Sequence, residues 1–210
     1  MSYPTYAVST ELDAVNQILS SVGQAPVTTL DLQNPEVGIV LNTLREVNKT
    51  VQSEGWTFNT ERHYELTADS ITFEIEYPEN ALSIDTHRYT HYDDYNTVRR
   101  NGKLYDRNKH TYEWKDGSDP RTITVDVVWY WNFTEVPPAV QAYITARSAR
   151  LCAIRMIGDQ TIYALLQEEE YSARATALEH ETQQGDMSIF GWRDEEDYHH
   201  SYQPFKALRR

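Results

Sequence analysis

The sequence has one cysteine, no long apolar run and a shortage of basic side chains among its 210 residues. Cys152 cannot form an internal disulfide, so the fold does not depend on an oxidising compartment. No stretch approaches the roughly 20 apolar residues that span a membrane, and residues 1–8 show no secretory signal. The 19 basic side chains are outnumbered by 32 acidic ones, and this net charge of -13 argues against a general nucleic-acid binder.

The remaining composition is that of a folded chain. Hydrophobic residues make up 40% and aromatic residues 12% of the sequence, which is too much for a disordered chain despite its charge. The length allows one domain, or one domain with a sizeable insertion. The 15 tyrosines have two interpretations, because tyrosine fills protein cores and also supplies contact area at interfaces.

Apolar residues recur at helical spacing in four segments. Thr10 and Asp13 have the spacing of a capping box, and Pro35 and Pro138 each fit a first helical turn. Glycine or proline follows or precedes each segment at the positions expected for helix ends. With the residues that cap or close them, the four predicted helices are 10–23, 34–55, 137–158 and 159–185.

The same periodicity predicts which side chains face inward. In the third and fourth helices we expect Ile154, Leu165 and Leu178 on or near the buried face. We expect the glutamates at residues 168–170 to be mostly solvated. Arg174 is then expected to form a weak helical ion pair with the glutamate four residues before it.

From residue 56 to residue 133 the hydrophobic period changes to two, which predicts an antiparallel β subdomain. Residues 71–77 alternate apolar and polar side chains and predict a strand. Asn101-Gly102, between two short strand-like segments, predicts a hairpin with a type I′ turn. Residues 122–131 are dense in β-branched and aromatic side chains and predict a central strand.

Motifs for chemistry are sparse. The sequence contains no glycine-rich phosphate loop, no G-x-S-x-G and no H-E-x-x-H. Cys152 lies in a predicted apolar helix, where a small buried hydrophobe is expected rather than a nucleophile. His87 and His91, with Asp93 and Asp94, are the residue types of a first-row metal site. The other interpretation of this segment is a polar, tyrosine-rich loop.

Glu74 and Glu76 share one face of the strand predicted at 71–77. Two carboxylates across a sugar-binding cleft are the machinery of glycoside hydrolases, and aromatic residues for sugar stacking are plentiful. A polar sheet face explains the same two residues. The residues alone thus indicate an acidic α+β protein built for contacts, with a cell-envelope glycan hydrolase as the enzyme alternative.

Five segments carry a family resemblance. They are 11–30 (ELDAVNQILSSVGQAPVTTL), 41–61 (LNTLREVNKTVQSEGWTFNTE), 102–107 (GKLYDR), 135–160 and 165–181 (LLQEEEYSARATALEHE). Together, and in this order, they resemble the tail tubular protein A family of short-tailed bacteriophages, also called the tail adaptor or gatekeeper protein. None of them is a catalytic signature, but an ordered set of five is more specific than a single motif.

The resemblance implies an α+β fold in which a four-helix bundle, residues 1–55 and 134–185, carries an inserted antiparallel β subdomain, residues 56–133. Residues 186–210 then form a C-terminal docking tail. The implied role is that of a structural virion protein, with no catalytic residue, no metal and no cofactor. Another phage head-completion connector with a similar bundle is the rival within phage proteins, and the large β insertion favours the tail adaptor.

The resemblance also implies partners. A homo-oligomeric ring of about twelve copies would lie below the portal protein and above the tubular nozzle formed by tail tubular protein B. Such a ring lines the channel through which the genome leaves, often offers part of the tail-fibre attachment surface, and has no membrane partner. The implied location is the short tail of the virion, after assembly in the host cytoplasm. An acidic channel wall would repel DNA phosphates, so that DNA slides without specific binding.

The segment 186–210 has no regular pattern, and its large apolar side chains have no local face to bury them. Such a tail is either disordered or docks onto a partner. On the resemblance, it threads into the portal and folds there. The expected portal-contacting residues are Phe190, Trp192, Phe205, Lys206, Arg209 and Arg210.

Overall fold

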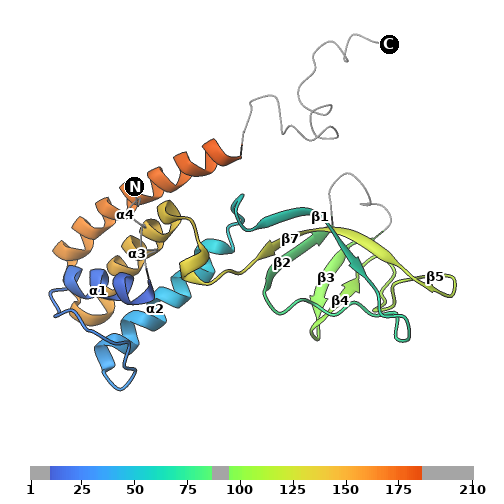
Figure 1. The fold of residues 1–210 in the computed structure, drawn as a ribbon, viewed down its shortest axis with the longest axis horizontal. Helices are drawn as coiled ribbons and strands as arrows, with labels where there is room; N and C mark the ends of the chain where they lie inside the picture. Colours follow the sequence, from blue (N-terminus) through green and yellow to red (C-terminus); the bar gives the residue numbers. More distant parts are fainter. Residues whose placement is uncertain (1–9, 87–94, 186–210) are drawn as a thin grey trace, which may run out of the picture. The chain divides into compact units, whose positions relative to one another are not determined.

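The computed structural model describes residues 10–86 and 95–185. This part of the chain divides into two compact units, which Figure 1 colours along the sequence. Of the described residues, the helical unit contains 10–59 and 130–180, and the β unit contains 60–86, 95–129 and 181–185. The protein therefore mixes helices and antiparallel strands, as the sequence predicts for an α+β chain.

The helices of the described chain lie close to the predicted segments (Figure 1). Four are α-helical, one short segment is a 3-10 helix and one is π-helical. In chain order they are α1 (Glu11–Ser21), α2 (Pro35–Gln52), η1 (Phe133–Glu135), α3 (Pro138–Cys152), η2 (Ala153–Ile157) and α4 (Gln160–Gln184).

Side chains cap the helix starts where the sequence predicts. The Thr10 hydroxyl accepts the backbone N–H of Asp13 at 3.2 Å, and the Asp13 carboxylate accepts the backbone N–H of Thr10 at 3.0 Å. Asn34 and Asp159 cap α2 and α4, each accepting the backbone N–H two residues later, at 3.1 and 2.7 Å. These bonds satisfy N–H groups that have no partner inside the helix, so local sequence fixes where the helices begin.

The third helix ends differently from the prediction. Its last turn is the π-helical segment η2, which contains one more residue per hydrogen-bonded turn than an α-helix. Gly158 closes it with a left-handed φ of 72°, and its N–H donates to the carbonyl of Ala153 at 2.9 Å. A side chain at Gly158 would be strained there, which explains glycine at this position.

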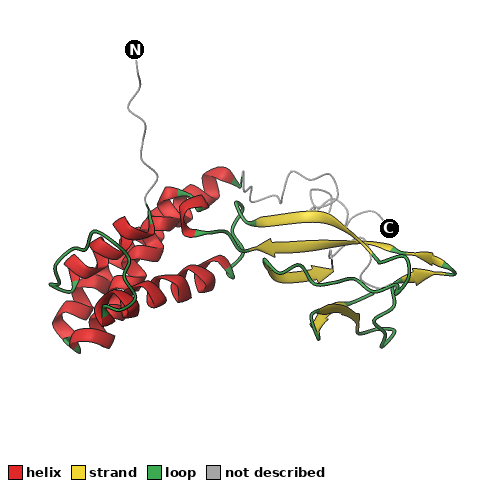
Figure 2. Ribbon diagram, turned by 60° about the horizontal axis from the view of Figure 1, so that its bottom comes forward, coloured by secondary structure: helices red, strands yellow, loops and turns green. Residues whose placement is uncertain are grey.

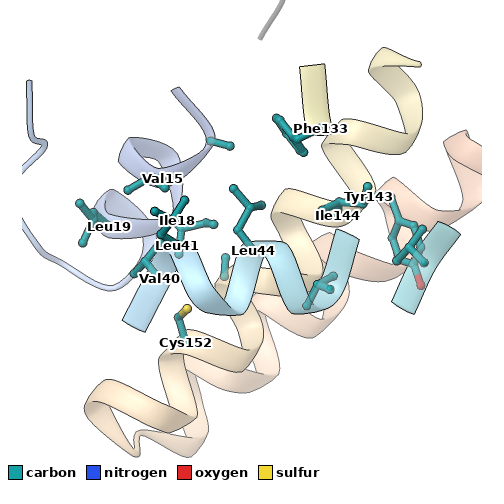
Figure 3. Close-up of a cluster of buried hydrophobic side chains, with 14 of the residues drawn as sticks. Val15, Ile18, Leu19, Val40, Leu41, Leu44, Phe133, Tyr143, Ile144 and Cys152 are labelled. Atoms are coloured by element: carbon teal, nitrogen blue, oxygen red, sulfur yellow. The ribbon is translucent and has the colours of Figure 1, made fainter. Parts of the chain in front are cut away.

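One hydrophobic cluster takes side chains from all four α-helices of the described chain. Helix α4 contributes least, since Leu166 and Ala177 are its only buried apolar residues there. The cluster therefore centres on α1, α2 and α3. Figure 3 labels ten of its members, namely Val15, Ile18, Leu19, Val40, Leu41, Leu44, Phe133, Tyr143, Ile144 and Cys152.

The β unit contains seven short strands among the described residues, drawn in yellow in Figure 2. All pair antiparallel, in a three-stranded sheet of order β1-β7-β2 and two hairpins, β3-β4 and β5-β6. In chain order they are β1 (Thr60–Thr67), β2 (Ala81–Thr86), β3 (Thr97–Arg100), β4 (Lys103–Asp106), β5 (Lys115–Asp116), β6 (Asp119–Pro120) and β7 (Thr122–Trp129).

Two of the strand predictions are confirmed. Strand β7 is the central strand of its sheet, and its buried side chains alternate from Ile123 to Trp129. Between β3 and β4, Asn101 and Gly102 have φ values of 51° and 73°, as a type I′ turn requires. The β unit has a hydrophobic cluster of its own, which includes Tyr95 and Trp114.

The strand predicted at residues 71–77 is not a regular strand, and only its end pairs, through an isolated antiparallel bridge between Glu76 and Lys103. The Asp69 carboxylate accepts the backbone N–H groups of Ile71 and Thr72 at 2.9 and 2.8 Å and forms a turn. Phe73 then has a φ of 55°, and Ile71 is 84% exposed. Two hydrogen bonds that the Asp69 carboxylate accepts from nearby backbone have thus overridden the alternating pattern that follows it.

Candidate interaction surfaces

A charged cluster joins α4 to α3. Glu170 of α4 is only 8% exposed, and its two carboxylate oxygens accept from Nε and Nη2 of Arg150 on α3. Arg147, one turn earlier on α3, brings its Nε to 4.0 Å from the same carboxylate. Arg150 also donates to the Tyr163 hydroxyl at 2.5 Å. Two guanidinium groups therefore compensate the one buried carboxylate of α4.

The same cluster extends to Glu54, which lies two residues after the end of α2. Glu54 accepts from Arg147 at 3.4 Å and from Arg174 of α4 at 3.5 Å. The Tyr143 hydroxyl on α3 accepts from both arginines at 3.0 Å. Polar contacts therefore hold α4 where apolar contacts are few. We call Glu54, Arg147, Arg150, Glu170 and Arg174 the ion cluster.

These pairings correct the sequence prediction for α4. Glu170 is buried rather than solvated, and Arg174 pairs with Glu54 rather than with Glu170. The reason is the helical period, because Glu170 lies one turn after the buried Leu166 and so faces α3. Glu168 and Glu169 are exposed, as predicted.

Three apolar side chains predicted to face inward are exposed. Leu165, Leu178 and Ile154 are 64%, 45% and 53% accessible. Ile154 lies in the π-helical turn, where the extra residue shifts the faces of the helix. On α4 Leu166 is buried, as its place on the predicted face requires, and Ala177 rather than its neighbour Leu178 is the other buried apolar residue. Helix α4 therefore presents apolar groups outward as well as carboxylates.

The β3–β4 hairpin carries a cationic and aromatic face. The register pairs Arg100 with Lys103 on one side of the hairpin, whereas Leu104 points to the other side and is fully buried. The Arg100 guanidinium lies 4.3 Å from the centre of the Tyr105 ring, and Tyr105 meets Tyr112 edge-on at 4.9 Å. We define the hairpin face as Val98, Arg100, Tyr105 and Tyr112.

The two glutamates of the hydrolase alternative lie in a surface pocket of 660 Å³. Glu74 forms an ion pair with Lys103. Hydrogen bonds from the backbone of Thr72 and Ile71 hold the pKa of the nearby Asp69 below its usual range, so Asp69 is a poor general acid. The strand face on which the hydrolase alternative depended is absent. The pocket is lined by Leu66, Thr67, Asp69, Thr72, Glu74, Ile75, Glu76 and Lys103.

Cys152 is fully buried on α3, and burial raises the pKa of its thiol, as expected for a structural cysteine. The metal candidates His87, His91, Asp93 and Asp94 lie outside the described residues. Within residues 10–86 and 95–185, no three His, Cys, Asp or Glu side chains gather closely enough to hold a metal ion. No helix in the same residues has the length and hydropathy of a membrane span.

The predicted portal contacts Phe190, Trp192, Phe205, Lys206, Arg209 and Arg210 also lie outside the described residues. Sequence reasoning missed both the ion cluster and the hairpin face. The signal for the hairpin face was present, because the Asn101-Gly102 turn fixes which residues share a side. The ion cluster left no such signal, since its members come from segments far apart in the chain.

Comparisons with known proteins agree with the resemblance. A family model described as tail tubular protein matches residues 12–187. Tail tubular protein A of Klebsiella phage KP34 is 26% identical over 169 residues, which cover 80% of this chain and 84% of that relative. The family match spans both the helical unit and the β unit. The chain therefore belongs to the tail tubular protein family, and is a structural protein of a phage tail.

Proposed function

We propose that the protein is a ring-forming head-to-tail adaptor that joins the portal to the tubular nozzle and lines the DNA ejection channel. The observation that carries this proposal is the family match over residues 12–187. Exposed Tyr171 and Leu178, which lie seven residues apart on one side of α4, support it, because grouped apolar side chains left in solvent often mark a protein contact. Part of the tail-fibre attachment surface belongs to the same proposal.

The proposed architecture is a four-helix bundle, residues 1–55 and 134–185, with residues 56–133 inserted as the β subdomain and residues 186–210 as the docking tail. Two observations support it. All four α-helices share one hydrophobic cluster, and the strands lie between α2 and α3 in chain order. In the proposed virion ring, about twelve such copies meet through their outer surfaces.

Electron microscopy of the full-length protein mixed with the portal of its own phage tests the adaptor role. We expect a closed ring of this protein on one face of the portal. A portal ring with no added density, or with density scattered over both faces, would contradict the proposal. A portal from an unrelated phage serves as the control for unspecific adhesion.

Removal of residues 186–210 tests the docking tail separately. We expect the truncated protein to keep the circular dichroism of its helices and to lose attachment to portal-bearing heads. Replacing Phe190, Trp192 and Phe205 by alanine should reproduce the loss if apolar burial anchors the tail. Attachment of the truncated protein at the level of the full chain would refute this part of the proposal.

A further inference from the structure

The arginines of the helical unit and those of the β unit differ in whether they form ion pairs. Within the described residues, each of the five arginines in the helical unit forms an ion pair inside the unit. On the β unit, Arg99, Arg100 and Arg107 have no carboxylate within ion-pair distance among those residues. Arg99, Arg100 and Arg107 therefore remain available for a partner, at and beside the hairpin face.

Within the hairpin face, the Arg100 side chain is held in place while its hydrogen-bond donors remain available. Stacking on Tyr105 orients the guanidinium plane, and its side chain donates no hydrogen bond to any described residue. The Tyr112 hydroxyl accepts from Asn101 at 3.3 Å, which fixes the neighbouring ring. A pre-oriented guanidinium beside two aromatic rings suits a surface that combines carboxylates with an apolar side chain.

Helix α4 of the same chain has such a surface. Leu165, Glu168, Glu169 and Ser172 lie at positions i, i+3, i+4 and i+7, which places them on one side of the helix. All four are exposed, and within the described part of the chain neither glutamate forms an ion pair. This side lies away from the buried stripe of Leu166, Glu170 and Ala177. We call these four residues the acidic face.

We propose that the hairpin face of one copy binds the acidic face of α4 on a second copy. This is a heterologous contact, in which the two copies use different surfaces. The net charge of -13 makes copies repel one another on average, so a contact between copies needs a local match of opposite charge. Arg100 pairs with the carboxylates of Glu168 and Glu169, and the two tyrosine rings cover Leu165. This inference rests on the proposed ring and names the surfaces that join its copies.

A cross-linking experiment tests the contact on the full-length protein. Cys152 is buried, so an added cysteine is the accessible thiol. Chains with Val98→Cys and with Ser172→Cys, which lie in the two faces and keep Arg100, Glu168 and Glu169, carry tags of different length. They are mixed with a flexible bis-maleimide linker, because a direct disulfide needs Cα atoms within about 7 Å. We expect the mixed dimer as the main product. A yield no higher than that of Val98→Cys mixed with the exposed Thr29→Cys would overturn the inference.

Charge reversal distinguishes a specific contact from random collision. Adding Glu168→Arg to the Ser172→Cys chain should lower the mixed-dimer yield about tenfold, because it places a cation opposite Arg100, whereas adding Lys49→Glu, outside both faces, should leave it unchanged. An equal effect of both substitutions would count against the proposed faces. If microscopy shows a portal-bound ring but the cross-link fails, the adaptor function stands and only this interface is wrong.

Discussion

Single side chains have their largest effect in the ion cluster. Glu170 is buried away from water, and this is tolerated only because Arg147 and Arg150 compensate its charge. Glu54 and Tyr143 then engage Arg147 and Arg174. A buried ion pair need not stabilise more than apolar packing would. Removing one partner, however, leaves the others with unmatched charge.

Glu170→Gln should therefore lower the free energy of unfolding by about 3 kcal/mol, the low end of the range for breaking buried pairs. The low end applies because the side chains of Arg150 and Glu170 retain 17% and 10% exposure. Urea unfolding followed by helical circular dichroism measures the change. Glu168→Gln, an exposed neighbour, should change it by less than about 0.5 kcal/mol. Equal effects of the two substitutions would show that the ion cluster does not hold α4.

The cap of α1 predicts a dependence on pH. Hydrogen bonds from the backbone and side chain of Thr10 hold the pKa of Asp13 below the model-compound value of 3.8. The unfolded chain then binds more protons, so this contribution to stability is fully present above pH 3.8 and is lost as the pH falls through the folded pKa. Asp13→Asn should flatten the acid limb of the stability curve. An unchanged slope would contradict this assignment.

Among the elements, two glycines in helical segments have opposite roles. Gly158 closes η2 with a φ of 72°, whereas Gly38 lies within α2 with ordinary helical geometry. An added Cβ at Gly38 would come no closer than 3.8 Å to the carbonyl oxygen of Leu32, which is an ordinary contact. The same substitution should therefore change stability in opposite directions at the two positions.

Gly158→Ala should destabilise the protein by about 1 kcal/mol, because alanine is strained in the left-handed region. Gly38→Ala should stabilise it by about 0.5 to 1 kcal/mol, because it restricts the unfolded chain and improves helix propensity. Denaturant midpoints measured at one protein concentration compare the two. Destabilisation by Gly38→Ala would show that α2 needs glycine for a close contact.

The whole molecule is dominated by its acidic charge. The five described arginines of the helical unit form internal ion pairs, whereas three described arginines of the β unit do not. An acidic ring of many copies would surround DNA without holding it, since phosphates are repelled by carboxylates. The net charge of -13 is thus compatible with the proposed channel wall, along which DNA would pass without binding.

The full-length protein should therefore not retard duplex DNA in a native gel at moderate salt. Arg100→Glu should leave this behaviour unchanged, because one surface cation supplies little of the phosphate affinity that a binder needs. A basic DNA-binding protein of similar size provides the positive control. Tight binding that weakens steeply with salt would contradict the proposed acidic channel wall.

Features that depend on neighbours along the chain follow from local sequence alone. Capping at Thr10 and Asn34, the turn at Asn101-Gly102 and the alternation of β7 each need only a few adjacent residues. Their energies arise within one turn or one strand, so the pattern is enough to predict them. The five family segments added the fold class and the family, which the match over residues 12–187 supports.

Features that join residues distant in the chain depend on packing in three dimensions. Arg174 pairs with Glu54 and not with Glu170. The two paired residues lie 120 positions apart in the chain, and no local pattern encodes their pairing. The exposure of Leu165 follows from which side of α4 meets the core. Burial and ion pairing are decided where separate elements meet, so sequence periodicity narrows the choices and packing in three dimensions selects among them.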